Sequence, residues 1–345
     1  MAGRFRGLQE RFPLDNTYNT ATLMMTYLEA IADAIRLEMR NDDRVFMIGE
    51  DIGTYGGAFK LTKGFLDEFG PQRVIDAPIS EAAIIGAGIG AALNGMRPVV
   101  EMQFMDFITN GFNQLVTVAG TTAYRWGLPV PMVVRGPSGG GVGANPFHSR
   151  NSEAWFAHAT GLKVVCPATA SDAKGLMTAS IRDQNPVVFF EHKGLYRKVK
   201  ENVPEGEYIV PLGQAKVIRE GSHVSVITYG SAVHMAIEAA DALASEGVLA
   251  EIVDIRTLVP FDQETVFESV RKTGRALVVH EAVLTAGFGG EIAAQIADAT
   301  FTYLDAPVKR VAAFDSPTPF APTLEKAVLP NAHGIAQAIR ELIRF

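Results

Sequence analysis

The chain has 345 residues, which is more than one compact core usually holds and favours two domains. Its net charge of −7 argues against a nucleic-acid-binding protein, and no apolar run is long enough to predict a membrane span. Cys166 is the single cysteine, which excludes an internal disulfide and is typical of a protein of the reducing cytoplasm.

The predicted elements alternate between helix and strand from Thr26 onward. Thr26 supplies a hydroxyl cap with Glu29 three residues later, and the apolar positions that follow are spaced for one helix face. Residues 1–25 carry arginines but no apolar signal-peptide core, and we interpret them as an N-terminal extension that is mobile or contacts a partner. In the first half we predict strands at 45–48, 99–104, 132–134, 162–166 and 187–190, and helices from 80, at 151–159 and at 171–182.

A polar stretch divides the chain. Residues 199–208 carry charges, a proline and a glycine without periodicity, which predicts a linker between a domain at 26–198 and a domain at 209–345. Beyond the linker we predict strands at 224–228, 250–255, 276–280 and 308–313, and helices at 231–245, 263–273, 290–303 and from 332. Continuous apolar strands that alternate with helices predict an α/β fold with parallel sheets covered on both faces.

Acidic residues at the ends of two predicted elements could carry chemistry. Glu50 and Asp51 follow the first strand, where open parallel sheets bind ligands, although a turn with solvated acids is the alternative. Ser80 is expected to cap the next helix and to place Glu81 near its positive end, a position that is often only structural. The small residues within 86–92 indicate close packing or an approach to a ligand, but their spacing does not fit a dinucleotide fingerprint.

Two later segments contain further candidates. Gln103, Phe104 and Phe107 lie at the end of a predicted strand and could line a pocket for a flat heterocycle, or the phenylalanines could belong to the core. The glycine-rich segment 136–143 leads to His148. It could cradle a phosphate, or it could form a mobile lid that carries His148 toward a substrate.

Several of these segments match, in order, the motifs of one family. They are Gly49-Glu50-Asp51, Pro78-Ile79-Ser80-Glu81-Ala82, Gln103-Phe104, His148-Ser149 followed by Glu153-Ala154, Asp172-Ala173-Lys174-Gly175-Leu176 and Arg256-Thr257-Leu258. Taken together, they resemble the beta subunit of the first component of 2-oxo acid dehydrogenase complexes, a family with pyruvate, branched-chain and acetoin enzymes. The resemblance covers about residues 26–345 and implies a transketolase-like pyrimidine-binding domain followed by a transketolase C-terminal-like domain.

The resemblance also implies roles for individual residues around thiamine diphosphate. By position, Glu81 is similar to the carboxylate that bonds the pyrimidine ring nitrogen, and Glu50 to a second acid in the proton path between paired active sites. Phe107 takes the place of the aromatic residue that stacks on the pyrimidine, and Gln103 is expected beside it. His148 is similar to the histidine that assists acyl transfer to a lipoyl group.

One signature of thiamine enzymes is missing from the sequence. The diphosphate-binding Gly-Asp-Gly, with an asparagine pair after it, does not occur. The resemblance therefore implies that an alpha subunit binds the diphosphate and Mg²⁺ in an alpha2-beta2 heterotetramer. It also implies a small 2-oxo acid as substrate and a lipoyl-bearing dihydrolipoamide acyltransferase as partner, and we expect a cytoplasmic location without nucleic-acid or membrane partners.

A potassium site is a further expectation. Asp183 and Asn185 end a predicted helix and could give oxygen ligands to a hard cation, although helix termination alone explains both. Some members of the family hold a structural K⁺, and the resemblance adds backbone oxygens at the positions of Met132, Ser180 and Ile181.

Alternative functions differ in what they require of the sequence. Pyruvate is the expected substrate, while branched-chain 2-oxo acids and acetoin stay open because the discriminating side chains are expected on the alpha subunit. A self-sufficient transketolase-like enzyme is disfavoured by the missing diphosphate signature. A non-catalytic assembly subunit is disfavoured because Glu50, Glu81, Gln103 and His148 are all present.

Overall fold

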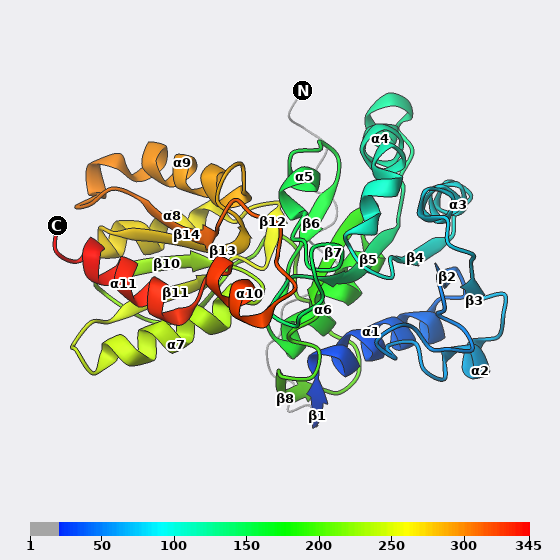
Figure 1. Ribbon diagram of the computed structural model, residues 1–345. Helices are drawn as coiled ribbons and strands as arrows, with labels where there is room; N and C mark the ends of the chain where they lie inside the picture. The colour runs from blue at the N-terminus through cyan, green and yellow to red at the C-terminus, as the bar shows by residue number, and fades with distance from the viewer. Residues whose placement is uncertain (1–20) are drawn as a thin grey trace.

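The structure, a computed structural model, describes residues 21–345 as two α/β lobes that pack side by side (Figure 1). The first lobe contains a seven-stranded sheet, the second lobe contains a five-stranded sheet, and a separate two-stranded ribbon lies at the edge. Residues 1–20, most of the expected N-terminal extension, lie outside the described residues. In the described part of the chain, no helix is long and apolar enough to cross a membrane.

The first sheet has the strand order β12-β6-β7-β5-β4-β2-β3. All neighbours run parallel except the edge strand β12, which is antiparallel to β6. The strands are β2 (Val45–Gly49), β3 (Val74–Asp76), β4 (Arg97–Glu101), β5 (Val133–Ser138), β6 (Lys163–Val165), β7 (Val187–His192) and β12 (Thr257–Val259). Every residue of β2, β5 and β7 is buried, which confirms the predicted parallel sheet with two covered faces.

Alternate residues of these strands face two different hydrophobic clusters. Val133 and Val187 pack in the cluster that contains α1 and α6, while Val134 and Val188 pack in the cluster that contains α3. The second cluster continues into the other lobe at Ile227, so the two lobes share one core.

The helices of the first lobe are α1 (Tyr27–Asn41), α2 (Phe65–Phe69), α3 (Glu81–Leu93), α4 (Gly120–Trp126), α5 (Glu153–Ala157) and α6 (Ala170–Arg182), with a 3-10 turn at Phe107–Gly111 and a π-helix at Gln114–Ala119.

The start of α1 follows the expected pattern. The Thr26 hydroxyl accepts a hydrogen bond from the Glu29 amide at 3.2 Å, and the Glu29 carboxylate accepts one from the Thr26 amide at 2.8 Å. These two bonds form the capping box that the sequence predicts, so two of the otherwise unpaired amides at the helix start are satisfied.

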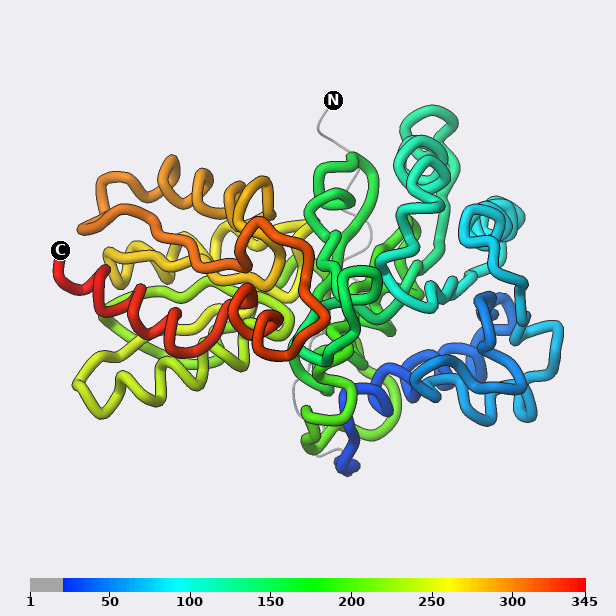
Figure 2. The backbone as a smooth tube through the Cα atoms, in the orientation of Figure 1, coloured from blue at the N-terminus to red at the C-terminus, as the bar shows by residue number. Residues whose placement is uncertain are grey.

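The second sheet has the order β14-β13-β10-β11-β9, in which only the edge strand β9 is antiparallel to its neighbour among the described strands. The strands are β9 (Lys216–Arg219), β10 (Val224–Thr228), β11 (Ala250–Asp254), β13 (Ala276–Val283) and β14 (Lys309–Ala313). The helices are α7 (Ala232–Ala244), α8 (Gln263–Thr273), α9 (Phe288–Thr300), α10 (Pro322–Val328) and α11 (Ala332–Leu342), with a 3-10 turn at Phe301–Tyr303. Figure 2 shows the segment with α10 at the boundary with the first lobe.

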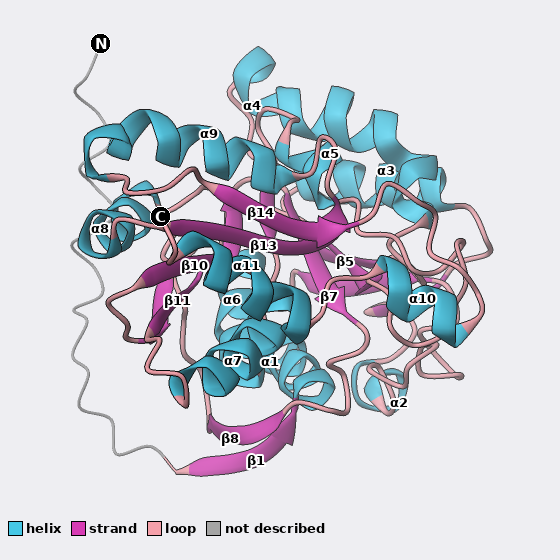
Figure 3. Ribbon diagram, turned by 60° about the vertical axis from the view of Figure 1, so that its left-hand side comes forward, coloured by secondary structure: helices cyan, strands magenta, loops and turns pink. Residues whose placement is uncertain are grey.

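The predicted linker is partly structured. β8 (Lys200–Pro204) pairs antiparallel with β1 (Thr22–Thr26), and this ribbon lies away from both larger sheets (Figure 3). The end of the expected extension and part of the predicted linker therefore form strands, which the sequence pattern did not predict. The sequence could not reveal this pairing because the partners lie far apart along the chain.

The sheet of the first lobe also contains a strand from the second half of the chain. β12 follows the linker in the sequence but pairs with β6, which precedes the linker. Beside this pairing, the Cys166 amide donates to the Arg256 carbonyl at 2.8 Å. Arg256 also donates to Asp172 at the start of α6, at 2.8 Å. The lobes are therefore joined by strand pairing and by a buried ion pair, in addition to their common core.

Candidate functional site

The expected acids lie at the carboxyl edge of the first sheet. Glu50 directly follows β2, and Gln103 follows the neighbouring strand β4, which ends at Glu101 and not at residue 104 as predicted. The last residues of these two paired strands approach closely: a Cβ placed on Gly49 would lie 2.9 Å from Cβ of Glu101, so this position requires glycine. Parallel strands put their carboxyl ends at one edge, where ligands of open α/β sheets bind.

Glu50 and Glu81 form a buried acid pair. Their exposed fractions are 6% and 8%, and Oε1 of Glu50 has no hydrogen-bond partner among the described residues. Burial raises the pKa of Glu50, and the negative charge of Glu81 raises it further. A buried carboxylate oxygen without a donor fits a ligand that brings one, such as a ring N–H or an amino group.

Ser80 does not cap the helix that begins with Glu81. Its hydroxyl donates to the Pro78 carbonyl at 2.9 Å, and no hydrogen bond joins it to the first turn of α3. The prediction of a side-chain cap is therefore wrong, because the conformation of Ser80 (φ −170°, ψ 59°) turns the hydroxyl back toward the preceding loop. Glu81 nevertheless begins α3 as expected, where the helix dipole favours a negative charge.

Three aromatic rings gather beyond the carboxyl end of β4. The ring centre of His148 lies 4.4 Å from that of Phe104 and 5.5 Å from that of Phe107, and each pair meets edge to face. Gln103 donates to Asp51 at 3.2 Å. The structure thus brings together Phe107 and His148 with Phe104, and Phe107 contacts the imidazole in this arrangement, while Gln103 contacts Asp51.

The glycine-rich loop is held by carboxylates of the second lobe. The Gly140 amide donates to Glu281 at 2.7 Å, and the amides of Gly141 and Gly143 donate to Glu325 at 2.9 and 3.1 Å. These amides are consequently occupied by the protein itself, so the expectation that they cradle a phosphate is not supported. Sequence reasoning missed Glu281 and Glu325, which lie more than 130 residues away; the only signal was a run of amides that needed acceptors.

A buried ion network supports the strand ends beneath the site. Arg135 on β5 forms ion pairs with Glu101 on β4 and Glu191 on β7, and the Tyr196 hydroxyl donates to Glu191 at 2.7 Å. All of these charged groups are buried. Since a buried charge without a partner is costly, the network fixes the relative position of three neighbouring strands.

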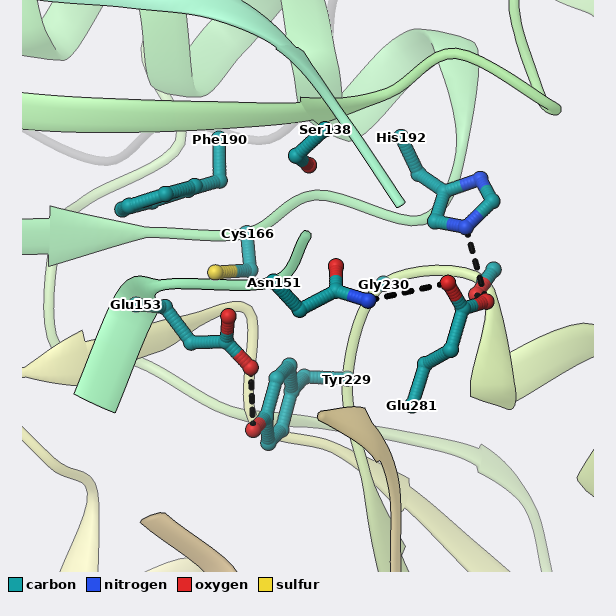
Figure 4. Close-up of a pocket in the computed structure, with 10 residues that line it drawn as sticks. Ser138, Asn151, Glu153, Cys166, Phe190, His192, Tyr229, Gly230 and Glu281 are labelled. Carbon is teal, nitrogen blue, oxygen red and sulfur yellow. Dashed lines mark hydrogen bonds and ion pairs between the residues drawn. The ribbon is translucent and has the colours of Figure 1, made fainter. Parts of the chain in front are cut away.

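A small cavity of about 20 Å³, lined by residues of both lobes, lies between them (Figure 4). His192 Nε2 lies 2.8 Å from Glu281 Oε2, and the Tyr229 hydroxyl donates to Glu153 at 2.9 Å. Burial raises the pKa of Glu153 to about 7. A cavity of this size holds about one water molecule, so it is too small for a substrate.

The expected potassium ligands already have other partners. The carbonyls of Ile181 and Asp183 accept hydrogen bonds from Arg97 at 2.8 and 3.1 Å, and the Asp183 carboxylate pairs with Lys163. The Met132 carbonyl accepts from an amide of β7 at 2.9 Å. In the described part of the chain, no group of three acidic, histidine or cysteine side chains is arranged to hold a metal.

Comparison with known proteins gives the family. Residues 24–199 match the family described as "Transketolase, pyrimidine binding domain", and residues 213–335 match "Transketolase, C-terminal domain". A chain of the solved structure "Split gene transketolase, inactive beta4 tetramer" superposes with a TM-score of 0.75 at 19% identity, over 93% of this chain and 99% of that chain. At this identity the similarity shows the fold.

Full-length relatives are much more similar in sequence. The chain is 47% identical to the 2-oxoisovalerate dehydrogenase subunit beta of Bacillus subtilis (strain 168), over 93% of this chain and 99% of the relative. It is 44% identical, with the same coverage, to the pyruvate dehydrogenase E1 component subunit beta of that organism. The mitochondrial pyruvate dehydrogenase E1 component subunit beta of Caenorhabditis elegans is 42% identical over 96% of each chain. This chain therefore belongs to the family of beta subunits of thiamine-diphosphate-dependent 2-oxo acid dehydrogenases.

Proposed function

We propose that this chain is the beta subunit of a heterotetrameric pyruvate dehydrogenase of the acetyl-transferring type. Such an enzyme decarboxylates a 2-oxo acid oxidatively and reductively acylates the lipoyl group of an acyltransferase. The observation that carries the proposal is the buried pair of Glu50 and Glu81, whose unpartnered oxygen fits an aminopyrimidine. A non-catalytic assembly subunit would have no need of this buried pair.

Thiamine diphosphate, when bound, supplies the electron sink for decarboxylation. Glu81 holds a proton between its carboxylate and the pyrimidine ring nitrogen, and Glu50, whose pKa is raised, relays protons at its unpartnered oxygen. Phe107 and Gln103 would hold the pyrimidine of the bound cofactor, and His148 would donate a proton to the lipoyl sulfur that is released when the acyl group bonds to the other sulfur and the disulfide breaks.

A partner chain completes the site. We propose an alpha subunit that binds the diphosphate and Mg²⁺, in an alpha2-beta2 heterotetramer, because the diphosphate signature is absent from this sequence. An apolar side chain two residues before Glu81 supports a covering chain, because Ile79 is 83% exposed.

Branched-chain 2-oxo acids are the second candidate, supported by the 47% identity to a 2-oxoisovalerate dehydrogenase subunit. The test is to purify the chain with its alpha subunit and to measure decarboxylation of pyruvate, 3-methyl-2-oxobutanoate and acetoin. The highest kcat/KM with pyruvate is expected. Preference for either other compound replaces the proposed substrate, and no turnover with any of the three contradicts the proposed function.

We also propose a potassium site and a cytoplasmic location. A potassium site at Met132, Ser180, Ile181, Asp183 and Asn185 would have to share carbonyls with Arg97, whose charge opposes a second cation. A thermal midpoint that is higher in KCl than in NaCl supports the site, and equal midpoints contradict it.

A cytoplasmic location is proposed because the lone thiol of Cys166 is free and buried.

A further inference from the structure

The loop that carries His148 is closed at its base by the first lobe. The Gly139 amide donates to the Arg150 carbonyl at 3.2 Å, which joins the two ends of the loop. The Arg150 amide in turn donates to Asp106 at 3.1 Å. These contacts fix where the loop leaves and re-enters the fold, but they do not reach its middle.

The middle of the loop is fixed by the second lobe. Glu281 accepts from the Gly140 amide and, at 2.9 Å, from the side chain of Asn151, so it ties both arms of the loop. Glu325 on α10 accepts from the amides of Gly141 and Gly143. Glu325 is 4% exposed, and a carboxylate so deeply buried depends on such donors.

The backbone of the loop is shaped for an anion. Gly139, Gly141 and Gly143 have φ values of 84°, 79° and 70°, a left-handed conformation that suits glycine, and the amides of Gly141 and Gly143 both point at one carboxylate. The anion at that point is the Glu325 carboxylate, where other proteins place a phosphate. The buried ammonium of Lys193 lies close to Asp106, Glu281 and Glu325, and balances part of their charge.

We propose that Glu325 is a positioning residue for acyl transfer. By holding the amides of Gly141 and Gly143, it fixes the loop so that the His148 ring sits against Phe104 and Phe107, ready to meet the lipoyl group. The inference rests on the proposed function, because it assigns Glu325 to the step in which His148 acts. It couples the second lobe to that step through the loop.

The test compares Glu325→Ala and Glu325→Gln in the tetramer with the alpha subunit. Glu238→Ala is the matched control, because Glu238 is an exposed helical glutamate of the same lobe. Reductive acylation of a free lipoyl domain and decarboxylation with an artificial electron acceptor are measured on each preparation. Amide hydrogen exchange of the peptide covering 139–151 reports the order of the loop independently of activity.

In Glu325→Ala, we expect faster exchange in 139–151 and a loss of lipoyl acylation of about 10- to 100-fold, with a much smaller loss in the artificial-acceptor assay. Glu325→Gln keeps one acceptor oxygen and should restore part of both losses, whereas Glu238→Ala should match the wild type.

Two results would overturn the inference: unchanged exchange in the loop, or equal losses in the two assays. If the wild-type tetramer fails to acylate the lipoyl domain, the proposed function falls and the role in transfer falls with it. Faster exchange in Glu325→Ala would then still show that Glu325 holds the loop.

Discussion

Glu81 lies beside Glu50 at the edge of the first sheet, and its negative charge adds to burial in raising the pKa of Glu50. Glu50 therefore holds a proton more readily than a glutamate at the surface does, because its ionised form is both desolvated and repelled by Glu81. The pair is therefore suited to passing a proton to and from a ring nitrogen.

Glu81→Gln should remove the proton held at the pyrimidine while keeping the shape of the side chain. We expect turnover to fall by roughly 10²- to 10⁴-fold in both the full reaction and the artificial-acceptor assay, with the tetramer intact. Glu264→Gln is the control, since Glu264 is an exposed glutamate at the start of α8. A Glu81→Gln tetramer with near wild-type turnover would refute the assignment.

His148→Ala should separate two steps of the reaction. Because His148 lies at the end of the glycine-rich loop, its loss should depress lipoyl acylation more than decarboxylation with an artificial acceptor. His333→Ala, at an exposed position of α11, is expected to affect neither assay. Equal losses in both assays would mean that His148 acts on decarboxylation or on cofactor placement.

The isolated chain should bind thiamine diphosphate weakly and should lack decarboxylase activity. The sequence has no signature for the diphosphate and its Mg²⁺, so only the pyrimidine half of the cofactor finds ligands here. Calorimetry with and without Mg²⁺ checks this expectation. Magnesium-dependent binding with a Kd of about 1 µM, without the alpha subunit, would contradict it.

Stability should depend on the protonation of Glu153. Burial raises its pKa from 4.5 to about 7, so its contribution is fully present below about pH 4.5 and is lost as pH rises through about 7. Glu153→Gln stays neutral and can still accept from Tyr229. The variant tetramer should therefore lose less of its thermal midpoint than the wild type between about pH 6 and about pH 8.5.

Asp254 provides the internal comparison for this experiment. Burial also raises the pKa of Asp254, to about 8. Part of the fall in thermal midpoint toward alkaline pH should therefore remain in Glu153→Gln. If the two proteins lose stability equally over this range, Glu153 is already ionised in the folded protein at neutral pH.

The elements that could be predicted are those whose signals are local. α8 spans residues 263–273 as predicted, because Asp262 caps it and Gly274 ends it in a left-handed conformation. β1, β8 and β12 were missed because each is a strand only through a partner distant in the sequence. Three residues with weak periodicity, such as Thr257–Val259, carry no strand signal of their own.

The residues of the candidate site also differ in whether a local pattern reveals them. Glu50 and Glu81 could be singled out because each occupies the end of a recognisable element. Glu325 gave no signal: it lies in the middle of the short helix α10, which was not predicted, and its role depends on amides 182 and 184 residues away. Contacts between lobes depend on how the lobes pack, and this packing is not encoded in any local pattern.

The pairing of β12 with β6 bears on how the chain folds during synthesis. The first sheet receives its last strand from residues 257–259, so it stays unfinished until the linker and the first part of the second lobe, up to residue 259, have left the ribosome. Until then the edge of β6 is open, with the apolar Val164 and Val165 that are fully buried in the finished protein. An open apolar edge invites pairing with another chain. A fragment that ends at residue 198 should therefore aggregate, and the unit that folds is the whole chain.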